Sequence, residues 1–418
     1  MEPVSDAQLA TLAGEARERW SVPGLTVGVV RDGEVTVAAD GVLRLGEEEP
    51  VTPESVFRIA SITKPFVATL AMTLVQDGLL ELDEPPPESP VEATLRQLLS
   101  HQGGLATEWP EAFDGLGDGD DALERLARLD PERLPVGRGE LFAYSNAGYW
   151  LVGAAIASAA GTTFEAAMEE RVLTPLGLSA TGFEPEAGVP GHDQLEPGSD
   201  EHRPADDTYP RARRPSGGLW SNVEDLLDFA ANHLGGPGPL RSESIAELQR
   251  PHVDGPGFRY GLGWFVTRRG DRTAVEHMGS VAGYQSLLLL VPEEQVAVAA
   301  LANSSRGLAP IRQVTRRLGL TPDRAEDHPL SPAALETFAG RYHGQGLELE
   351  LAADDGMLRL AVVEVNSLTG EEQSWPGVRA RPVRDAEFEI LEGQWRGERF
   401  DFPRHGVVRF GTLAVRVE

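Results

Sequence analysis

Apolar and polar residues follow two different periods along the chain, and each period dominates a different region. The spacing predicts helices over residues 5–20, 63–76 and 147–160, and a glycine closely follows the last two. Short apolar or alternating runs predict strands on both sides of this helical middle. The predicted strands are 25–31, 34–39, 260–267, 274–277, 285–291 and 296–302.

The connections between these strands are short, which limits how the strands can pair. Asp32-Gly33 joins the first two strands and is a strong signal for a β-hairpin. Short connections imply antiparallel pairing because parallel strands need long crossovers. The sequence therefore predicts an α/β protein of the α+β type. One antiparallel sheet, built from the strands on both sides of the helical middle, is flanked by helices. An inserted helical subdomain interrupts it.

Two segments of the middle region carry local signals of their own. Residues 221–224 read Ser-Asn-Val-Glu, a capping box that predicts a helix to about residue 233. Residues 184–215 are rich in proline, glycine and charge without a clear period. A long surface loop of this type often forms a lid over an active site.

The last part of the chain is organised differently. After a boundary at residues 321–332, short alternating segments such as 346–351 and 357–363 are separated by turns. This pattern predicts a small antiparallel β-barrel or sandwich. We therefore expect two domains, residues 1–325 and residues 332–418.

Composition narrows the possible partners and the compartment. The net charge of −29 argues against a nucleic-acid partner and against docking on anionic membranes. No apolar run approaches the roughly 18 residues that a membrane span needs. Residues 1–20 have the pattern of an amphipathic helix and not that of a signal peptide. We expect a cytoplasmic protein, and its oligomeric state stays open.

Several kinds of chemistry have no support in the sequence. The chain has no cysteine, which excludes disulfides, thiolate metal sites and cysteine nucleophiles. It also lacks a Gly-x-Ser-x-Gly elbow, a His-Glu-x-x-His helix and a P-loop. We expect no cofactor and no metal. His101 is interpreted as a residue that fixes a loop, and Arg211, Arg213 and Arg214 as a solvated basic cluster rather than a grip on a substrate carboxylate.

The only lysine of the chain, Lys64, lies three residues after Ser61. All other cationic side chains are arginine, whose guanidinium stays protonated, whereas the pKa of a lysine falls readily on burial. Pro65 places the pair near a helix start, where this spacing puts both side chains on one face. An amine that accepts a proton activates a serine, and the Ser61 N–H could bind an oxyanion. The alternative is that Ser61 is a plain N-cap.

Tyr144 and Asn146 form a second candidate group. A phenol with a pKa near 10 is a weak base unless a cation such as Lys64 stabilises the phenolate. The Asn146 amide could orient the lysine or bind a substrate carbonyl. An equally good interpretation makes the tyrosine a helix cap.

The third candidate group is His277, Gly279 and Ser280, at the end of a predicted strand. A histidine here could donate to a substrate or relay a proton at neutral pH. Gly279 would let a ligand approach the backbone closely, and the Ser280 N–H could complete an oxyanion hole. Taken alone, one histidine near a glycine is more often structural.

Ser-x-x-Lys at Ser61, Tyr-x-Asn at Tyr144 and His-x-Gly at His277, in this order, resemble the serine β-lactamase and penicillin-binding-protein superfamily. The similarity is greatest to class C-like serine hydrolases, which include esterases, DD-peptidases and D-aminopeptidases. It extends over residues 9–318, and residues 335–342 resemble the opening of the lipocalin-like C-terminal domain that some members carry. The connecting segments that also match are 98–105, 175–178 and 216–221.

The resemblance implies a β-lactamase-like domain, a lipocalin-like β domain and an acyl-enzyme mechanism. Ser61 would attack a carbonyl while Lys64 and Tyr144 shuttle its proton. The N–H groups of Ser61 and Ser280 would hold the oxyanion, and water or another nucleophile would release the acyl group. Whether Lys64 or Tyr144 is the base stays open.

One departure from the superfamily pattern affects the expected substrate. Where β-lactamases of this type have Lys-Thr-Gly, this chain has His277-Met278-Gly279. The groups that would bind the carboxylate of the antibiotic are missing, which favours esterase or peptide-type chemistry. We expect a serine hydrolase acting on an ester or amide, including a peptide with a D-residue. The alternatives are a penicillin-binding-protein-type thioesterase or acyltransferase that cyclises a nonribosomal peptidyl thioester, and a non-catalytic binding module.

Overall fold

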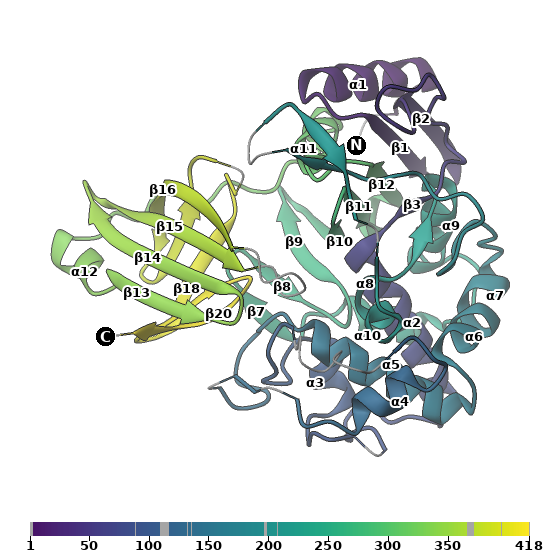
Figure 1. Cartoon of the computed structure of the whole chain (residues 1–418), viewed down its shortest axis with the longest axis horizontal. Coiled ribbons are helices and arrows are strands. Elements are labelled where there is room, and N and C mark those ends of the chain that lie inside the picture. Colours follow the sequence, from purple (N-terminus) through teal and green to yellow (C-terminus); the bar gives the residue numbers. More distant parts are fainter. Residues whose placement is uncertain are drawn as a thin grey trace.

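The chain forms a sheet with helices on both faces and a β-barrel beside it (Figure 1). Within the described residues no single helix is long and apolar enough to cross a membrane, although Asn146–Ala160 and Phe164–Leu176, bent by 78°, pass together on length and composition. The computed structural model describes residues 3–417 except 88, 109–116, 132, 135, 196–198, 207, 366–371 and 394.

The large sheet has eight antiparallel strands, and both ends of the region contribute to it. Their order is β2-β1-β12-β11-β10-β9-β8-β7. β1 pairs with β12, with Val29 opposite Val298, so the N-terminal hairpin extends the later strands. The strands are β1 (Gly24–Arg31), β2 (Glu34–Gly41), β7 (Val253–Gly255), β8 (Phe258–Tyr260), β9 (Phe265–Arg269), β10 (Arg272–Val281), β11 (Tyr284–Val291) and β12 (Val296–Ala302).

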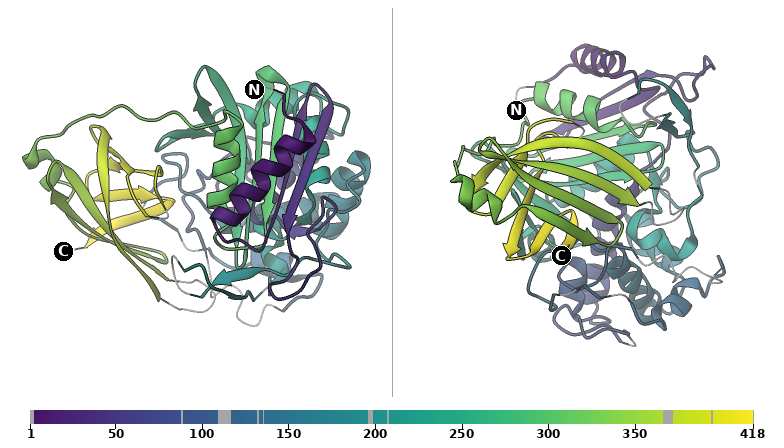
Figure 2. Two further views of the ribbon diagram at one scale, coloured as in Figure 1. Left: turned by 90° about the horizontal axis from the view of Figure 1, so that it is seen from above. Right: turned by 60° about the vertical axis from the view of Figure 1, so that its left-hand side comes forward.

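Helices cover the two faces of this sheet, as Figure 2 shows. α1 (Asp6–Arg19) and α11 (Leu308–Arg317) pack against each other on one face and share an apolar core with the sheet. The larger core on the other face includes α2 (Thr63–Gln76), α5 (Asn146–Ala160) and α9 (Val223–His233). α2 is buried over most of its length and therefore forms a rigid support for the residues at its start.

The segment between β2 and β7 contains the inserted helices that the pattern predicts. Two short strand pairs, β3 (Phe57–Arg58) with β6 (Trp220–Ser221) and β4 (His192–Gln194) with β5 (His202–Pro204), lie in the same segment. The other helical elements among the described residues are η1 (Ala60–Ile62), α3 (Leu95–Leu99), α4 (Ala122–Ala127), α6 (Phe164–Met168), η3 (Glu169–Leu173), α7 (Thr174–Leu176), η4 (Arg211–Arg213), α8 (Arg214–Gly217), α10 (Ser242–Gln249), η5 (Pro292–Glu294) and α12 (Pro332–Glu336).

The C-terminal strands form a closed antiparallel barrel, because β13 pairs with β20. Leu347, Leu349 and Leu351 alternate with outward-facing residues along β14 and point into the barrel core. The predicted fold class is thus confirmed, with a barrel and not a sandwich. The strands are β13 (Gly340–Gly344), β14 (Leu347–Asp354), β15 (Met357–Val365), β16 (Glu372–Arg384), β17 (Glu387–Ile390), β18 (Arg399–Arg404), β19 (Val407–Phe410) and β20 (Thr412–Val417).

Some predicted element boundaries are wrong, and each has a local cause. The predicted strand 260–267 is two strands, because the Gly261 N–H donates to the Trp264 carbonyl and closes a turn between them. The cap of α9 is Asn222, whose side chain accepts from the Asp225 N–H, so the predicted Ser-x-x-Glu box is not used.

The barrel contacts the rest of the protein at the loop before α5. Val407 and Leu413 of the barrel form a small apolar cluster with Ala143 of this loop. Arg409, also from the barrel, donates to the Asp254 carbonyl of the sheet edge at 3.1 Å.

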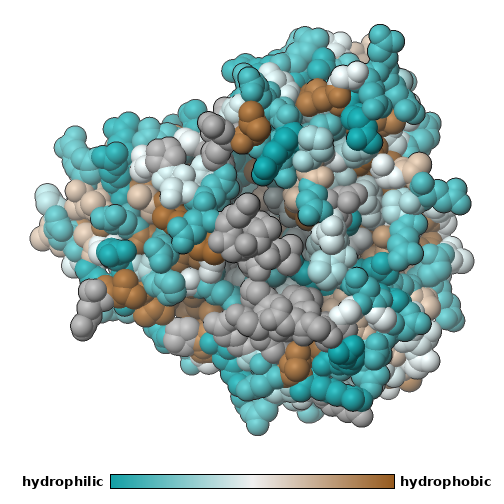
Figure 3. Space-filling view, viewed as in Figure 1, coloured by the Kyte–Doolittle hydropathy of each residue, from teal (hydrophilic) through white to brown (hydrophobic). Residues whose placement is uncertain are grey.

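The face of the molecule in Figure 3 is mostly hydrophilic, with scattered hydrophobic patches, as a highly charged surface predicts.

Candidate active site

Ser61 lies in η1, a 3₁₀ helix of one turn that directly precedes α2. Ala60 has a φ of 46°, a left-handed conformation that is uncommon for a residue with a side chain and often marks a functional site. Neither η1 nor α2 begins with a side-chain cap. The interpretation of Ser61 as a plain N-cap is therefore wrong, and its hydroxyl faces other groups.

Lys64 is fully buried, and three polar groups surround its side-chain nitrogen. Nζ lies 3.1 Å from Ser61 Oγ. It donates to Asn146 Oδ1 and to the Ser216 carbonyl, each at 2.7 Å. The centroid of the Tyr144 ring is 4.7 Å from Nζ. Residues far apart in the sequence thus converge on the only lysine of the chain.

The Tyr144 side chain also hydrogen-bonds to Ser61. Burial raises the pKa of Tyr144, and the hydrogen bond to Ser61 lowers it by less, so the phenol stays protonated. The cap of α5 is Ser145, whose hydroxyl accepts from the Gly148 N–H at 3.0 Å. The alternative that makes Tyr144 a helix cap is therefore wrong.

His277 is buried on β10, with its ring centroid 6.5 Å from that of Tyr144. Nδ1 lies 2.7 Å from the Met278 carbonyl and Nε2 lies 3.3 Å from the Tyr260 hydroxyl. Because the carbonyl can only accept, Nδ1 carries the proton and Nε2 accepts from Tyr260. Burial, reinforced by Lys64, lowers the pKa of His277 to about 3, so this imidazole is neutral at ordinary pH.

Gly279 brings β10 close to the backbone that precedes the nucleophile. A Cβ at this position would collide with the Ile59 carbonyl and the Ser286 hydroxyl. Ser286 Oγ itself donates to the Ile59 carbonyl at 2.8 Å. The sequence predicts close approach of a ligand at this glycine, whereas the close approach seen in the structure is within the protein.

Among the described residues, the part of β10 after Glu276 has a paired strand on one side only. β9 pairs with β10 only as far as Glu276, whereas β10 continues to Val281 with β11 as its partner on the other side. Ser280 lies on this continuation, and its hydroxyl accepts from Gln285 Nε2 at 2.8 Å. Its predicted role in an oxyanion hole depends on the backbone N–H and stays a prediction.

Glu108 and Arg213 complete the site, although no sequence pattern indicates Glu108 and the sequence predicts Arg213 only as part of a solvated cluster. The Asn146 amide donates to the Glu108 carboxylate, and Arg213 pairs with its other oxygen at 2.7 Å. Burial lowers the pKa of Lys64 well below its ordinary value, while the Glu108 charge raises it and the Arg213 charge lowers it. These contacts span 38 and 105 positions of sequence, so no local pattern predicts them.

The neighbouring arginines also have internal partners. Arg211 and Arg214 both bond to the Glu165 carboxylate at 2.8 Å. Arg214 bonds in addition to Glu184 at 2.5 Å. The interpretation of these arginines as a solvated cluster is therefore wrong.

The predicted loop 184–215 is partly ordered by the hairpin of β4 and β5. His192 Nδ1 lies 2.9 Å from the Asn303 carbonyl, and His202 Nε2 lies 2.9 Å from the Ser304 hydroxyl.

Across the part of the chain that the structure describes, no group of three histidine, aspartate or glutamate side chains is placed to hold a metal ion.

The family model named Beta-lactamase matches residues 9–321. The chain belongs to the Beta-lactamase family. Members of this family are serine hydrolases of the β-lactamase and penicillin-binding-protein type.

Two curated relatives of this Beta-lactamase family member match most of its length. It is 29% identical over 369 residues to penicillin-binding protein 4 of Amycolatopsis lactamdurans, covering 79% of this chain and 95% of the relative. It is 25% identical over 421 residues to a D-aminopeptidase of Gluconobacter oxydans, covering 92% of this chain and 77% of the relative.

Solved structures support the same assignment. The crystal structure of SurE has a TM-score of 0.77 and 27% identity, covering 99% of both chains, so the similarity includes the barrel. A D-amino acid amidase from Ochrobactrum anthropi, at 23% identity and a TM-score of 0.64, covers 74% of this chain and 97% of that one and shares the fold.

Proposed function

We propose that the protein is a serine hydrolase that forms an acyl-enzyme at Ser61 from an ester or amide substrate. The observation that carries the proposal is the position of Lys64 Nζ, 3.1 Å from Ser61 Oγ in a fully buried environment. A nucleophile within hydrogen-bond reach of a base, with the base oriented by other groups, is the arrangement that nucleophilic catalysis needs.

The neighbours of Lys64 are compatible with a neutral amine as the base. A neutral amine has two N–H groups and one lone pair. The Asn146 and Ser216 oxygens accept the two N–H groups at 2.7 Å each, which leaves the lone pair for the Ser61 hydroxyl. The lowered pKa of Lys64 favours the same protonation state. Lys64 would then take the Ser61 proton as the oxygen attacks the substrate carbonyl.

Tyr144 has a different part in this mechanism. Its raised pKa disfavours a phenolate, so it serves as a proton donor and not as the first base. The phenol would pass a proton to the leaving group and be reprotonated from Lys64, which returns the amine to its neutral form. The N–H groups of Ser61 and Ser280 would bind the developing oxyanion.

His277 restricts the substrate. A neutral imidazole offers no charge to a substrate carboxylate, unlike the lysine that β-lactamases of this type place here. We therefore favour neutral ester or amide substrates, including peptides with a D-residue, over β-lactams. The D-aminopeptidase relative and the 26%-identical structure of SurE with D-Leu support a D-configured substrate.

A second candidate transfers the acyl group to an amine, as in cyclisation of a peptidyl thioester. The observation that favours it is the contact of the barrel with the site: the Glu108 N–H donates to Gln345 Oε1 at 3.0 Å, and barrel residues pack on the loop before Tyr144. A second body over the acyl-enzyme would restrict water and favour a bound amine.

One experiment separates these candidates. The protein is incubated with esters, D-peptide amides and peptidyl thioesters, and intact mass is followed together with product identity. An adduct that maps to Ser61, is absent in Ser61→Ala and releases a linear acid supports hydrolysis. A macrolactam product supports cyclisation. No adduct with any substrate or with a fluorophosphonate would favour the non-catalytic binding module.

A further inference from the structure

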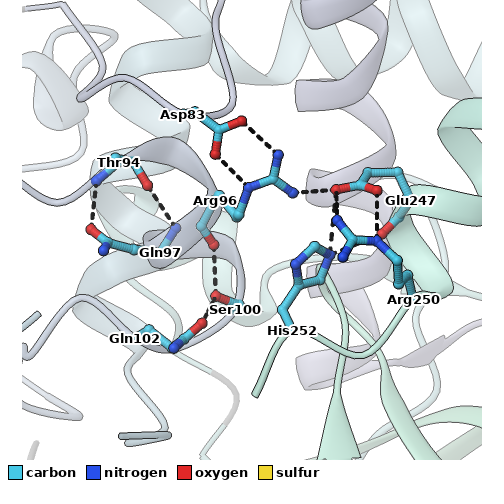
Figure 4. Close-up of polar contacts among 9 residues, drawn as sticks. All are labelled: Asp83, Thr94, Arg96, Gln97, Ser100, Gln102, Glu247, Arg250 and His252. Carbon is cyan, nitrogen blue, oxygen red and sulfur yellow. Dashed lines mark hydrogen bonds and ion pairs between the residues drawn. The ribbon is translucent and has the colours of Figure 1, made fainter. Parts of the chain in front are cut away.

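His101 is a buried histidine that the proposed mechanism does not use, and it lies on a rigid base. It follows α3, whose N-terminus has a capping box of Thr94 and Gln97. Figure 4 shows that Arg96 on this helix bonds to Asp83 and Glu247. Because Glu247 belongs to α10, these contacts tie α3 to the body of the protein.

The residues on both sides of His101 are fixed in the same network. Ser100 Oγ lies 2.7 Å from the Arg96 carbonyl oxygen and 3.0 Å from Gln102 Oε1 (Figure 4). The Gln102 N–H donates to the Gln97 carbonyl at 2.7 Å. His101 is thus held at a defined position before it contacts the active-site loop.

His101 binds the backbone on both sides of Tyr144. The Ala143 N–H donates to the His101 carbonyl at 2.9 Å. The Ser145 N–H donates to His101 Nδ1 at 3.0 Å. The imidazole also lies against the Tyr144 ring, with centroids 4.3 Å apart and planes inclined by 33°. Two backbone hydrogen bonds and one ring contact therefore restrain the phenol that faces Ser61.

Two features of His101 are energetically unfavourable. His101 has a left-handed φ of 58°, which is uncommon outside glycine. Nδ1 accepts from Ser145, so the ring proton is on Nε2, and this buried atom has no hydrogen-bond partner among the described residues. An unpaired buried donor costs roughly 1–3 kcal/mol. Backbone strain and unpaired buried donors are retained mainly at positions where the function of the protein depends on the resulting geometry.

We propose that His101 is a positioning residue that holds Tyr144 against Ser61 through the Ala143 and Ser145 backbone. The inference rests on the proposed acyl-enzyme function and extends it to a residue outside the reacting groups. It requires the neutral imidazole, whose Nδ1 lone pair takes the Ser145 N–H, and it assigns the ring no proton transfer with the substrate.

Two substitutions separate the acceptor from the backbone conformation. Asparagine tolerates a left-handed φ and keeps an acceptor close to Nδ1, whereas glycine tolerates the same φ and has no acceptor. We expect His101→Gly to slow labelling of Ser61 by a fluorophosphonate about 100-fold, the scale of a small misplacement of a catalytic group. His101→Asn should restore the rate to within about fivefold of the wild type. In turnover of an ester substrate, His101→Gly should lower kcat and leave KM nearly unchanged.

A double-mutant cycle tests whether the effect passes through Tyr144. In a Tyr144→Phe background, His101→Gly should cost less than about threefold, because there is no phenol left to position. His233→Asn, a change at a buried histidine whose ring contacts Phe229 and Trp264, is the matched control and should leave labelling unchanged.

Each outcome has a defined meaning. Wild-type labelling of Ser61 with an equally fast His101→Gly variant would overturn the inference and leave the proposed function standing. A folded His101→Asn variant as slow as the glycine variant, or equal losses in both backgrounds of the cycle, would also overturn it. If His101→Gly does not fold, the labelling rate of folded His101→Asn decides. Absence of any adduct in the wild type would instead overturn the proposed function.

Discussion

Asn146 joins Lys64 to Glu108: its Oδ1 accepts from the amine, and its Nδ2 donates to the carboxylate. The pair Glu108 and Arg213 therefore acts on Lys64 both through a hydrogen-bonded chain and through its charges. The Glu108 carboxylate and the Arg213 guanidinium therefore shift the pKa of Lys64 in opposite directions.

Neutralising each charge should move the pH dependence of activity in opposite directions. The Glu108 carboxylate raises the pKa of Lys64, so Glu108→Gln lowers that pKa and moves the acid limb of kcat/KM to lower pH. Arg213 lowers the pKa, so Arg213→Gln moves the limb to higher pH. The measurement is the pH profile of nitrophenyl ester hydrolysis. Two shifts of the same sign, or no shift, would contradict the assignment of Lys64 as the base.

Adding one methyl group at Gly279 should disable the nucleophile without unfolding the protein. The new Cβ collides with the Ile59 carbonyl and displaces the backbone that carries Ser61. We expect Gly279→Ala to slow fluorophosphonate labelling about 100-fold, with a circular dichroism spectrum like that of the wild type. Gly182→Ala is the control, since a Cβ there meets nothing within 4 Å. Equal rates for the two variants would refute this role of Gly279.

These two predictions show where sequence reasoning succeeds and where it stops. Helix 63–76 and strand 296–302 are predicted with the bounds that the structure has, because their periodicity and end signals are local. Ser61 and Lys64 are one turn apart, so their meeting is also a local property. Glu108 and Arg213 reach the site only through the folding of distant segments. The role of Gly279 depends likewise on a backbone that lies far away in sequence.

Loosening the contact between the barrel and the loop before Tyr144 should reduce turnover. Leu413 packs against Ala143, and truncation of a buried leucine costs about 2–5 kcal/mol. We expect Leu413→Ala to lower both the urea midpoint and kcat. Leu351→Ala, a comparably buried change inside the barrel, should lower the midpoint while kcat stays near the wild-type value. If both variants keep wild-type kcat, the barrel does not support the site.

Acid should destabilise the protein through its buried histidines. Burial lowers the pKa of His233 to about 3, whereas an unfolded histidine titrates near 6.5. The unfolded state therefore binds the extra proton, and the free energy of unfolding falls as the pH drops from about 6.5 towards 3, by up to about 1.4 kcal/mol per pH unit. Urea unfolding at pH 7.5 and pH 5 should show a smaller loss for His233→Gln than for the wild type. Identical losses would mean that His233 is not buried in its neutral form.

The central claim is that a neutral Lys64 removes the proton from Ser61, and Lys64→Arg tests it most directly. Arginine keeps N–H donors at this position but carries a positive charge that it cannot lose in a protein. The decisive measurement is the rate of Ser61 adduct formation, followed by intact mass at neutral pH for the wild type and for folded Lys64→Arg. We predict rapid labelling of the wild type and a loss of at least about 1,000-fold in the variant. Labelling of Lys64→Arg at the wild-type rate would contradict the mechanism.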